Sequence, residues 1–254
     1  MTQLSDYWRI TKKIALSDLK LRYKNSLLGI FWSLLEPLLI FAVLYLVFYY
    51  VMDLQVGHYY LFLFLGIICW DLFEKATMMG MTSITDKPSL VKKIFIPRET
   101  LLLGRCITAL LMILFELVIF FILLLISGIP ITPLFLLFPF ILIGEFLIAV
   151  GIGFALAALN VYYRDVQYIW AVLLRALFFL SPVIYSVTIY PAEYAELLML
   201  NPLARVIEAS RKTTLYNSLP TLLDIGIIYL AALLSLAIGY FIFTRLEPRF
   251  AEEI

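Results

Sequence analysis

The stretch "TLLLGRCITALLMILFELVIFFILLLIS", residues 100–127, decides the fold. It is a long apolar run in which Arg105 and Glu116 are the only charged residues. Crossing the hydrocarbon core of a bilayer takes about 20 apolar residues of helix. The run is continuously apolar and does not alternate, which favours a helix over a strand of a membrane barrel. We therefore predict a transmembrane helix over residues 100–127.

Five further apolar runs lie on either side of this one. They occupy residues 29–52, 59–81, 134–159, 166–181 and 221–244. The chain of 254 residues is 64% hydrophobic and only 15% charged, whereas about 25% of residues are charged in soluble domains. The sequence thus predicts an all-α polytopic membrane protein, with a six-span domain over residues 29–254, and excludes a soluble globular domain.

Lysine and arginine residues set the expected orientation of the spans. If the N-terminus lies in the cytoplasm, the cytoplasmic segments carry thirteen of these residues and the external segments carry three. The external three are Arg205, Arg211 and Lys212. This asymmetry follows the positive-inside rule. We expect a multi-pass protein with both termini in the cytoplasm and, because the first 28 residues are long and charged, no cleaved signal peptide.

Residues 1–28 are predicted to contain an amphipathic helix that lies on the inner leaflet. On a helical projection Arg9, Lys13, Lys20 and Lys24 fall in one arc, and with Arg22 they are the candidate contacts for headgroups. The opposite face holds Leu4, Tyr7, Trp8, Ile10, Ile14 and Leu21. Two interpretations stay open: the helix only anchors the chain, or its cations also contact an anionic lipid-linked substrate.

The stretch "DKPSLVKKIFIPRE", residues 86–99, is strongly charged although it lies between two apolar runs. Pro88 and Pro97 bracket a short predicted helix over about 88–96. Its apolar face is formed by Leu90, Val91, Ile94 and Phe95, and Lys92 and Lys93 point the other way. A helix with one exposed apolar face needs a groove to cover it, which its own chain, the headgroups or a partner subunit can supply.

Charged residues inside the predicted spans are costly and usually face the interior of the bundle. Matching their depths predicts two ion pairs, Glu74 with Arg105 and Glu36 with Arg175. These pairs are interpreted as locks on helix packing, and proton coupling remains the alternative.

Two further features concern the path of a substrate. Aromatic residues recur along the first span at Phe41, Tyr45, Phe48 and Tyr49, either to line a channel or to pack in the core. After the fifth span, residues 182–200 are too apolar for a solvated loop. We expect two short re-entrant helices there, near 182–188 and 192–200, with an ordinary external loop as the alternative.

The sequence lacks the motifs of several classes of enzyme and nucleotide-binding protein. The chain has no phosphate-binding G-x-x-x-x-G-K-[ST] motif and only one histidine, His58. Cys69 and Cys106 lie in apolar runs and are interpreted as buried hydrophobic residues. The sequence therefore indicates no catalytic residue, cofactor or metal in this chain.

Five motifs in order resemble one family, the membrane subunits of type-2 ABC exporters, in the branch that exports polysaccharides and polyol phosphates. The motifs are "RYKNSLLGIFWSLLEPLL" (22–39), "VKKIFIPRETL" (91–101), "NVYYRDV" (160–166), "SPVIY" (181–185) and "NPLARVIEASR" (201–211).

The resemblance implies a transport subunit that works as a homodimer in the bacterial inner membrane. Two copies of a separate ATPase, which binds ATP and Mg²⁺, would dock on the coupling helix at 88–96. The cargo would be a polyprenyl-pyrophosphate-linked glycan of O-antigen type, which meets the cations of residues 1–28 first. The region 182–200, with Pro182, Tyr185 and Tyr190, would form an outer gate.

Rival cargoes are teichoic acid, capsule, a drug or a lipid. A different class, a membrane enzyme that modifies glycans or lipids, would use inner-face carboxylates such as Asp86, Glu99 and Asp165.

Overall fold

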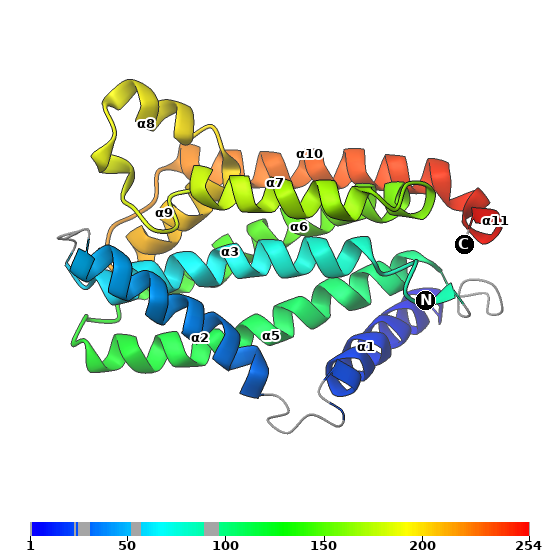
Figure 1. Ribbon diagram of the computed structural model, residues 1–254, viewed down its shortest axis with the longest axis horizontal. Coiled ribbons are helices and arrows are strands. Elements are labelled where there is room, and N and C mark those ends of the chain that lie inside the picture. The colour runs from blue at the N-terminus through cyan, green and yellow to red at the C-terminus, as the bar shows by residue number, and fades with distance from the viewer. Residues whose placement is uncertain (1, 23, 25–30, 52–56, 89–96, 254) are drawn as a thin grey trace.

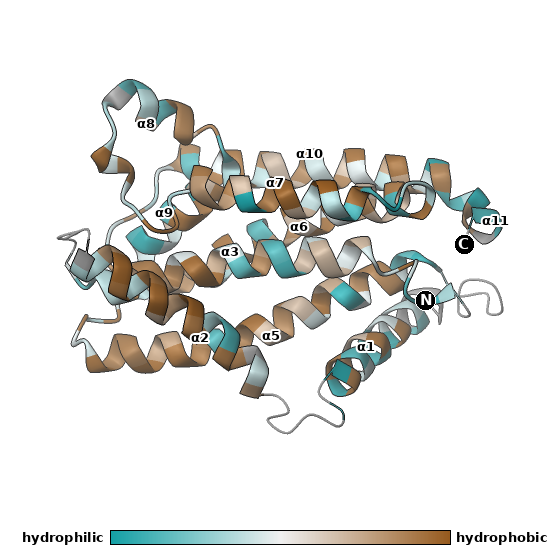
Figure 2. Cartoon of the chain, viewed as in Figure 1, coloured by the Kyte–Doolittle hydropathy of each residue, from teal (hydrophilic) through white to brown (hydrophobic). Residues whose placement is uncertain are grey.

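The computed structural model describes residues 2–22, 24, 31–51, 57–88 and 97–253, and within these ranges every regular element is helical. Long helices run lengthwise beside one another, and the N- and C-terminal ends lie at the opposite end of the bundle from helix α8 (Ala192–Leu198) (Figure 1). Apolar residues dominate the long helices (Figure 2). The expected all-α architecture is confirmed for the described residues.

Each predicted span corresponds to a helix. The helices are α2 (Trp32–Tyr45) with its π-helical extension η2 (Leu46–Val51), α3 (Tyr59–Met81), α5 (Glu99–Ile126), α6 (Leu137–Tyr162) after the 3-10 turn η3 (Pro133–Leu136), α7 (Val166–Leu180) and α10 (Leu222–Leu246).

Three helical stretches are long and apolar enough to cross a bilayer, namely Glu99–Ile126, Pro133–Tyr162 and Leu222–Arg249. Two others, Leu34–Tyr50 and Val166–Leu180, are apolar but shorter. Helix α3 has the length but carries three charged residues. In the described residues each of the six predicted spans is thus helical, while six membrane crossings remain a prediction.

Helix α3 forms the centre of the bundle. Every residue from Leu61 to Trp70 is buried, and the helix packs against α2, α5, α6, α7 and α9 (Pro202–Thr214). A helix that is apolar all round belongs in a protein core or in the membrane, and the contacts of α3 place it in the core of this bundle. The charges of its second half, near Lys75, therefore lie among neighbouring helices.

Helices α6 and α10 approach each other most closely at two glycines. A Cβ atom added to Gly239 would overlap the carbonyl of Gly151. Close backbone approach of this kind is how small residues join membrane helices, because it maximises van der Waals contact.

Helix α1 (Thr2–Arg22) packs on the first turns of α5. Thr11 and Ala15 are buried in this contact, and a Cβ on Gly104 would come within 2.6 Å of Ile14. Burial raises the pKa of the Tyr7 hydroxyl. The predicted apolar face is therefore divided between the bundle and the surface, because Trp8 remains 60% exposed.

The region after α7 differs from the expectation. A 3-10 turn, η4 (Val187–Ile189), replaces the helix expected over 182–188, whereas α8 falls within the expected 192–200. The backbone at Pro182 and Val183 forms turns because the side chain of Arg211 binds both carbonyl oxygens. The chain ends in the turn η5 (Glu247–Arg249) and α11 (Phe250–Glu253).

Candidate coupling region and translocation groove

The predicted ATPase-coupling residues Leu90, Val91, Lys92, Lys93, Ile94 and Phe95 lie outside the described residues. The structure describes both flanks of this segment, up to Pro88 and from Pro97 onward. The flanks matter because they connect the segment to the rest of the protein.

The first flank is tied to α1 and α5 by a chain of ion pairs. Lys87 Nζ lies 2.6 Å from Asp18 Oδ1 on α1, and Arg105 Nε lies 3.1 Å from Asp18 Oδ2. Arg105 Nη2 also donates to Asp86 at 2.9 Å. The predicted pair of Glu74 with Arg105 is therefore wrong. Depth matching considered only the spans, whereas the partners of Arg105 come from α1 and the loop.

The second flank is tied to the C-terminal region. Arg98 donates to the backbone carbonyl of Glu247 and lies 5.7 Å from the ring of Phe250. Phe250 is fully buried beside Phe243 of α10, with ring centroids 5.4 Å apart. A cation over an aromatic ring adds about 0.5–2 kcal/mol, so α11 and the segment's exit are held together.

A buried charge cluster joins α3 to α5. Lys75 Nζ lies 2.6 Å from Asp71 Oδ2 and 2.7 Å from Glu116 Oε1, and Glu116 is fully buried. Glu74 instead accepts a hydrogen bond from Trp70 Nε1 at 2.7 Å. The cluster fits the interpretation of intramembrane charges as locks on packing, although with other partners than those predicted.

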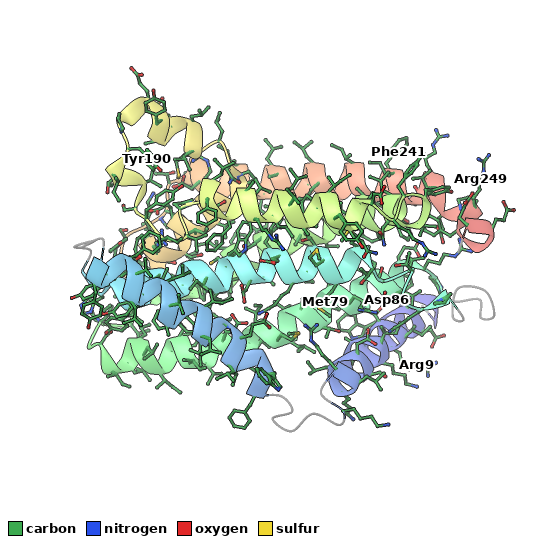
Figure 3. All side chains as sticks on the ribbon, in the orientation of Figure 1. Arg9, Met79, Asp86, Tyr190, Phe241 and Arg249 are labelled. Carbon is green, nitrogen blue, oxygen red and sulfur yellow. The ribbon has the colours of Figure 1, made fainter. Side chains whose placement is uncertain are left out.

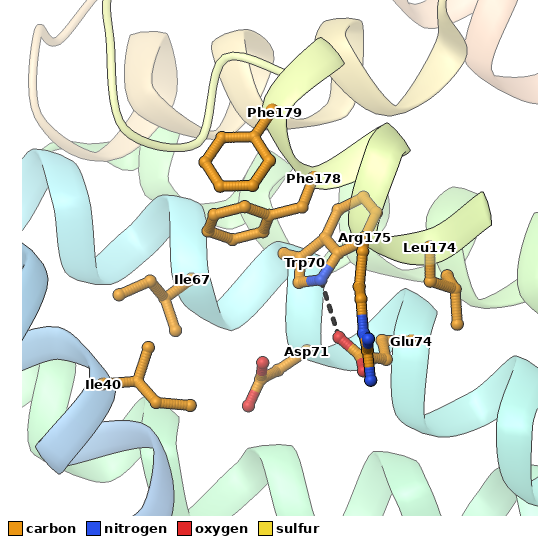
Figure 4. A pocket seen from close by; sticks show the side chains of 9 residues that line it. All are labelled: Ile40, Ile67, Trp70, Asp71, Glu74, Leu174, Arg175, Phe178 and Phe179. Atoms are coloured by element: carbon orange, nitrogen blue, oxygen red, sulfur yellow. Dashed lines mark hydrogen bonds between the residues drawn. The ribbon is translucent and has the colours of Figure 1, made fainter. Parts of the chain in front are cut away.

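A groove of about 220 Å³ opens between α2, α3 and α7 (Figure 4). It is lined by Ile40, Ile67, Trp70, Asp71, Glu74, Leu174, Arg175, Phe178 and Phe179. The walls are thus apolar and aromatic, with both signs of charge along one side. Such a lining can bind a ligand that has apolar faces and hydroxyl groups.

The predicted pair of Glu36 with Arg175 is not among the ion pairs of the described residues, and both side chains are exposed. Helix α2 packs on α3 and α5, and α7 packs on α3 and α6. Both helices contact α3, and both contribute residues to the groove.

The aromatic stripe of α2 and η2 packs partly against α3. Phe41 lies 5.1 Å from Phe64, and Tyr45 lies 6.1 Å from Tyr59. Tyr49 stacks on Tyr45 at 5.0 Å and is 40% exposed. Phe48 also packs against the core. The stripe therefore contributes to packing, and Tyr49 offers an accessible ring at its outer end.

The predicted outer-gate residues gather beside α8. Pro182 is buried, and the rings of Tyr185 and Tyr190 meet edge to face at 5.4 Å. Both tyrosines line a pocket of about 430 Å³ between the end of α7 and α8. The burial and contact of these side chains are described here, whereas gating by them remains a prediction.

Arg211 on α9 anchors this region, a role that its position among the external cations does not predict. It is fully buried and donates to the carbonyls of Pro182 at 2.7 Å, Val183 at 2.8 Å and Phe62 at 3.2 Å. Glu208, one turn earlier, pairs with it at 2.9 Å. An arginine on the apolar face of a helix, with a glutamate three residues before it, was the available signal.

These features define a class of protein. Within the described residues the molecule is an apolar helical bundle with buried charges, a groove between helices, and no cluster of side chains suited to a metal ion. Apolar helices of this length are typical of a multi-pass membrane protein. The chain belongs to the ABC-2 type transporter family, whose model matches residues 11–215.

Curated relatives resemble the chain over nearly its whole length. Two O-antigen export system permease proteins RfbA of Klebsiella pneumoniae are 28% and 29% identical over 236 residues, which cover 92% of this chain and 91% of each relative. An RfbA permease of Myxococcus xanthus is 28% identical over 254 residues, 99% of this chain and 98% of that protein. Membership in the family implies an ABC ATPase as partner.

Proposed function

We propose that this chain is the permease of an ATP-driven exporter that moves a polyprenyl-pyrophosphate-linked polysaccharide of O-antigen type out of the cytoplasm. The observation that carries the proposal is the match to O-antigen export permeases over more than nine-tenths of both chains. A match of that extent covers every helix of the bundle and both flanks of residues 89–96. It therefore supports a shared architecture from end to end.

The motor belongs to another subunit. The sequence has no G-x-x-x-x-G-K-[ST] motif, so ATP and Mg²⁺ bind to the partner ATPase, in two copies. The coupling helix at about 88–96 enters a groove of that ATPase with Leu90, Val91, Ile94 and Phe95, and Lys92 and Lys93 contact its rim. Both termini and this segment face the cytoplasm, in the inner membrane.

A second copy of this chain completes the channel. The exposed faces of α2 and α7 are apolar yet carry Glu36 and Arg175, and charged residues in membrane spans rarely face lipid. A two-fold partner covers both faces and leaves a passage between the copies. Phe41, Tyr45, Phe48 and Tyr49 line that passage.

The lipid-linked end of the substrate arrives at α1. Five cations of the N-terminal region, Arg9, Lys13, Lys20, Arg22 and Lys24, are exposed, and together they attract a pyrophosphate at the inner leaflet. The glycan leaves past Pro182, Tyr185 and Tyr190. A membrane enzyme is not favoured, because Asp86, one of its candidate carboxylates, is bound by Arg105.

The proposal is tested in a strain that lacks the gene. We expect polyprenyl-linked polysaccharide to accumulate in the cytoplasm, where a glycan-specific probe reaches it only after the inner membrane is opened. The intact gene restores surface glycan, and a Val91→Pro version does not. Normal surface glycan in the deletion strain would contradict the proposal and direct the search to teichoic acid, capsule, drug or lipid cargo.

A further inference from the structure

We infer that Asp18 is the joint that connects the ATPase-coupling segment to helix α1. It is a positioning residue, which transmits movement and does not touch the cargo. The inference rests on the proposed function, in which an ABC ATPase docks on residues 88–96.

Three separate parts of the chain meet at this carboxylate. Lys87, the residue before Pro88, reaches one oxygen at 2.6 Å, and Arg105 on α5 faces the other at 3.1 Å. Arg105 then continues to Asp86, beside Lys87 in sequence. Asp86 lies at the end of the bundle where α1 packs (Figure 3). Two acids and two bases therefore alternate in one chain, so that the entry of the coupling segment is fixed to two helices.

The burial of these groups separates this network from an ordinary surface ion pair. The side chain of Asp18 is 11% exposed, that of Arg105 17% and that of Lys87 21%. The pair of Asp6 with Arg9 on the same helix is 56% and 68% exposed, and exposed pairs of that kind contribute little. Removing the carboxylate of Asp18 leaves the half-buried Lys87 without its partner and leaves Arg105 with Asp86 alone, which is unfavourable.

Asp18 is not needed merely to hold α1 on the bundle. Thr11 and Ala15 are buried against α5, Ile14 fills the space above Gly104, and Thr108 donates to the carbonyl of Ala15 at 3.3 Å. The additional contribution of Asp18 is its ion pair with Lys87. The carboxylate therefore joins a helix that is already packed to the loop that enters the coupling segment.

The two ends of the segment consequently reach different helices. The entry reaches α1 through Asp18 and α5 through Asp86 and Arg105, and the exit reaches the end of α10 through Arg98, Glu247 and Phe250. A displacement of the segment by the ATPase thus moves three helices at once, and Asp18 carries the part that reaches the N-terminal cations. Contiguous ion pairs of this kind transmit coupling between distant sites.

The test begins with Asp18→Asn, which keeps the shape and removes the charge, in the complex of the permease with its ATPase. We expect the ATPase to co-purify and to hydrolyse ATP as before, while glycan export falls about tenfold, within the range found for mutations along coupled networks. Asp6→Asn is the matched control and leaves export unchanged. Wild-type export in Asp18→Asn would overturn the inference.

A second variant covers the outcome in which Asp18→Asn folds poorly. In Asp18→Cys/Lys87→Cys a reversible bifunctional methanethiosulfonate reagent replaces the ion pair by a covalent tether, and both native cysteines are buried. We expect export to be low in the reduced protein and to recover when the same sample is cross-linked. Export that stays low after complete cross-linking would overturn the inference that a connection between Asp18 and Lys87 is needed for export.

The failure of this inference is distinguishable from a failure of the proposed function. Val91→Pro in the coupling segment is expected to abolish co-purification of the ATPase. If the ATPase still co-purifies with Val91→Pro, the docking site in the proposed function is wrong. If Val91→Pro behaves as expected and Asp18→Asn exports normally, only the role of Asp18 is wrong.

Discussion

At the scale of single residues, Arg211 shows how a membrane protein stabilises irregular backbone. The chain leaves α7 at Ser181, and the carbonyls of Pro182 and Val183 have no helical partners there. The fully buried guanidinium of Arg211 supplies the donors for both carbonyls. Its planar fork reaches Phe62 of α3 as well, which a lysine cannot reproduce.

Replacing Arg211 is therefore expected to destabilise the protein. Arg211→Ala leaves three carbonyls and Glu208 without their donor, at a cost of about 3–5 kcal/mol, and Arg211→Lys recovers only part of it. Thermal unfolding of the purified protein in detergent measures the effect. The control is Arg205→Ala on the same helix, since its partner Asp224 keeps Lys212. Equal losses in Arg205→Ala and Arg211→Ala would contradict this assignment.

The tyrosines of the aromatic stripe are expected to differ from one another. Tyr45 stacks on Tyr59, so Tyr45→Ala removes buried packing and lowers stability. Tyr49 keeps an exposed ring, so Tyr49→Ala is expected to preserve stability and to slow export if the stripe lines the passage. Export rate and the melting temperature of both variants are the measurements. A wild-type export rate and glycan length in Tyr49→Ala would contradict the hypothesis that the aromatic stripe lines the passage.

At the scale of helices, the contact of α6 with α10 depends on glycine at Gly239. Any Cβ there meets the carbonyl of Gly151, which is backbone and cannot move aside. Gly239→Ala is expected to lower stability by about 1–3 kcal/mol, the usual cost of overpacking.

A second glycine in α10 provides the matched control. A Cβ at Gly226 meets nothing within 4 Å, so Gly226→Ala is expected to be neutral or to stabilise the helix by up to about 1 kcal/mol. Denaturation of both variants in the same detergent separates packing from helix propensity. If both alanines had the same effect, close approach would not explain Gly239.

The helices were predictable because length and continuous apolar character are local properties of a sequence. All six runs became helices with closely similar bounds, for example 59–81 for α3. Helix α9 was not assigned although Asn201 caps it and Pro202 occupies its first turn, which are ordinary start signals. That omission came from treating the region after α7 by its apolar content alone.

The site was less predictable because the partners in an ion pair depend on tertiary structure. Arg105 was paired by depth with Glu74, whereas its partners Asp18 and Asp86 lie outside the predicted spans. The three cations outside the membrane in the predicted topology are also explained only in three dimensions. Arg205 and Lys212 pair with Asp224, and Arg211 pairs with Glu208, so each of these cations has an acidic partner in the fold.

At the scale of the whole molecule, helix α7 is mostly exposed in a single copy of the chain. Leu174 is its one buried residue, and Val172 is 64% exposed. Apolar residues can face lipid at no cost, and α10 exposes Leu230 and Leu234 in the same way. The difference is charge, since α7 exposes Arg175 and α10 exposes no charged residue along its central turns.

A dimer interface at α7 therefore predicts an asymmetry in cross-linking. A cysteine at Val172 is expected to join two copies under mild oxidation in native membranes, because an isologous two-fold interface brings equivalent faces together. A cysteine at Leu234, equally apolar and 51% exposed, faces lipid and is expected to stay monomeric. Cross-linked dimer on a non-reducing gel is the readout. Dimer formation through Leu234 but not through Val172 would place the second copy against α10, and the groove between α2, α3 and α7 would then face lipid.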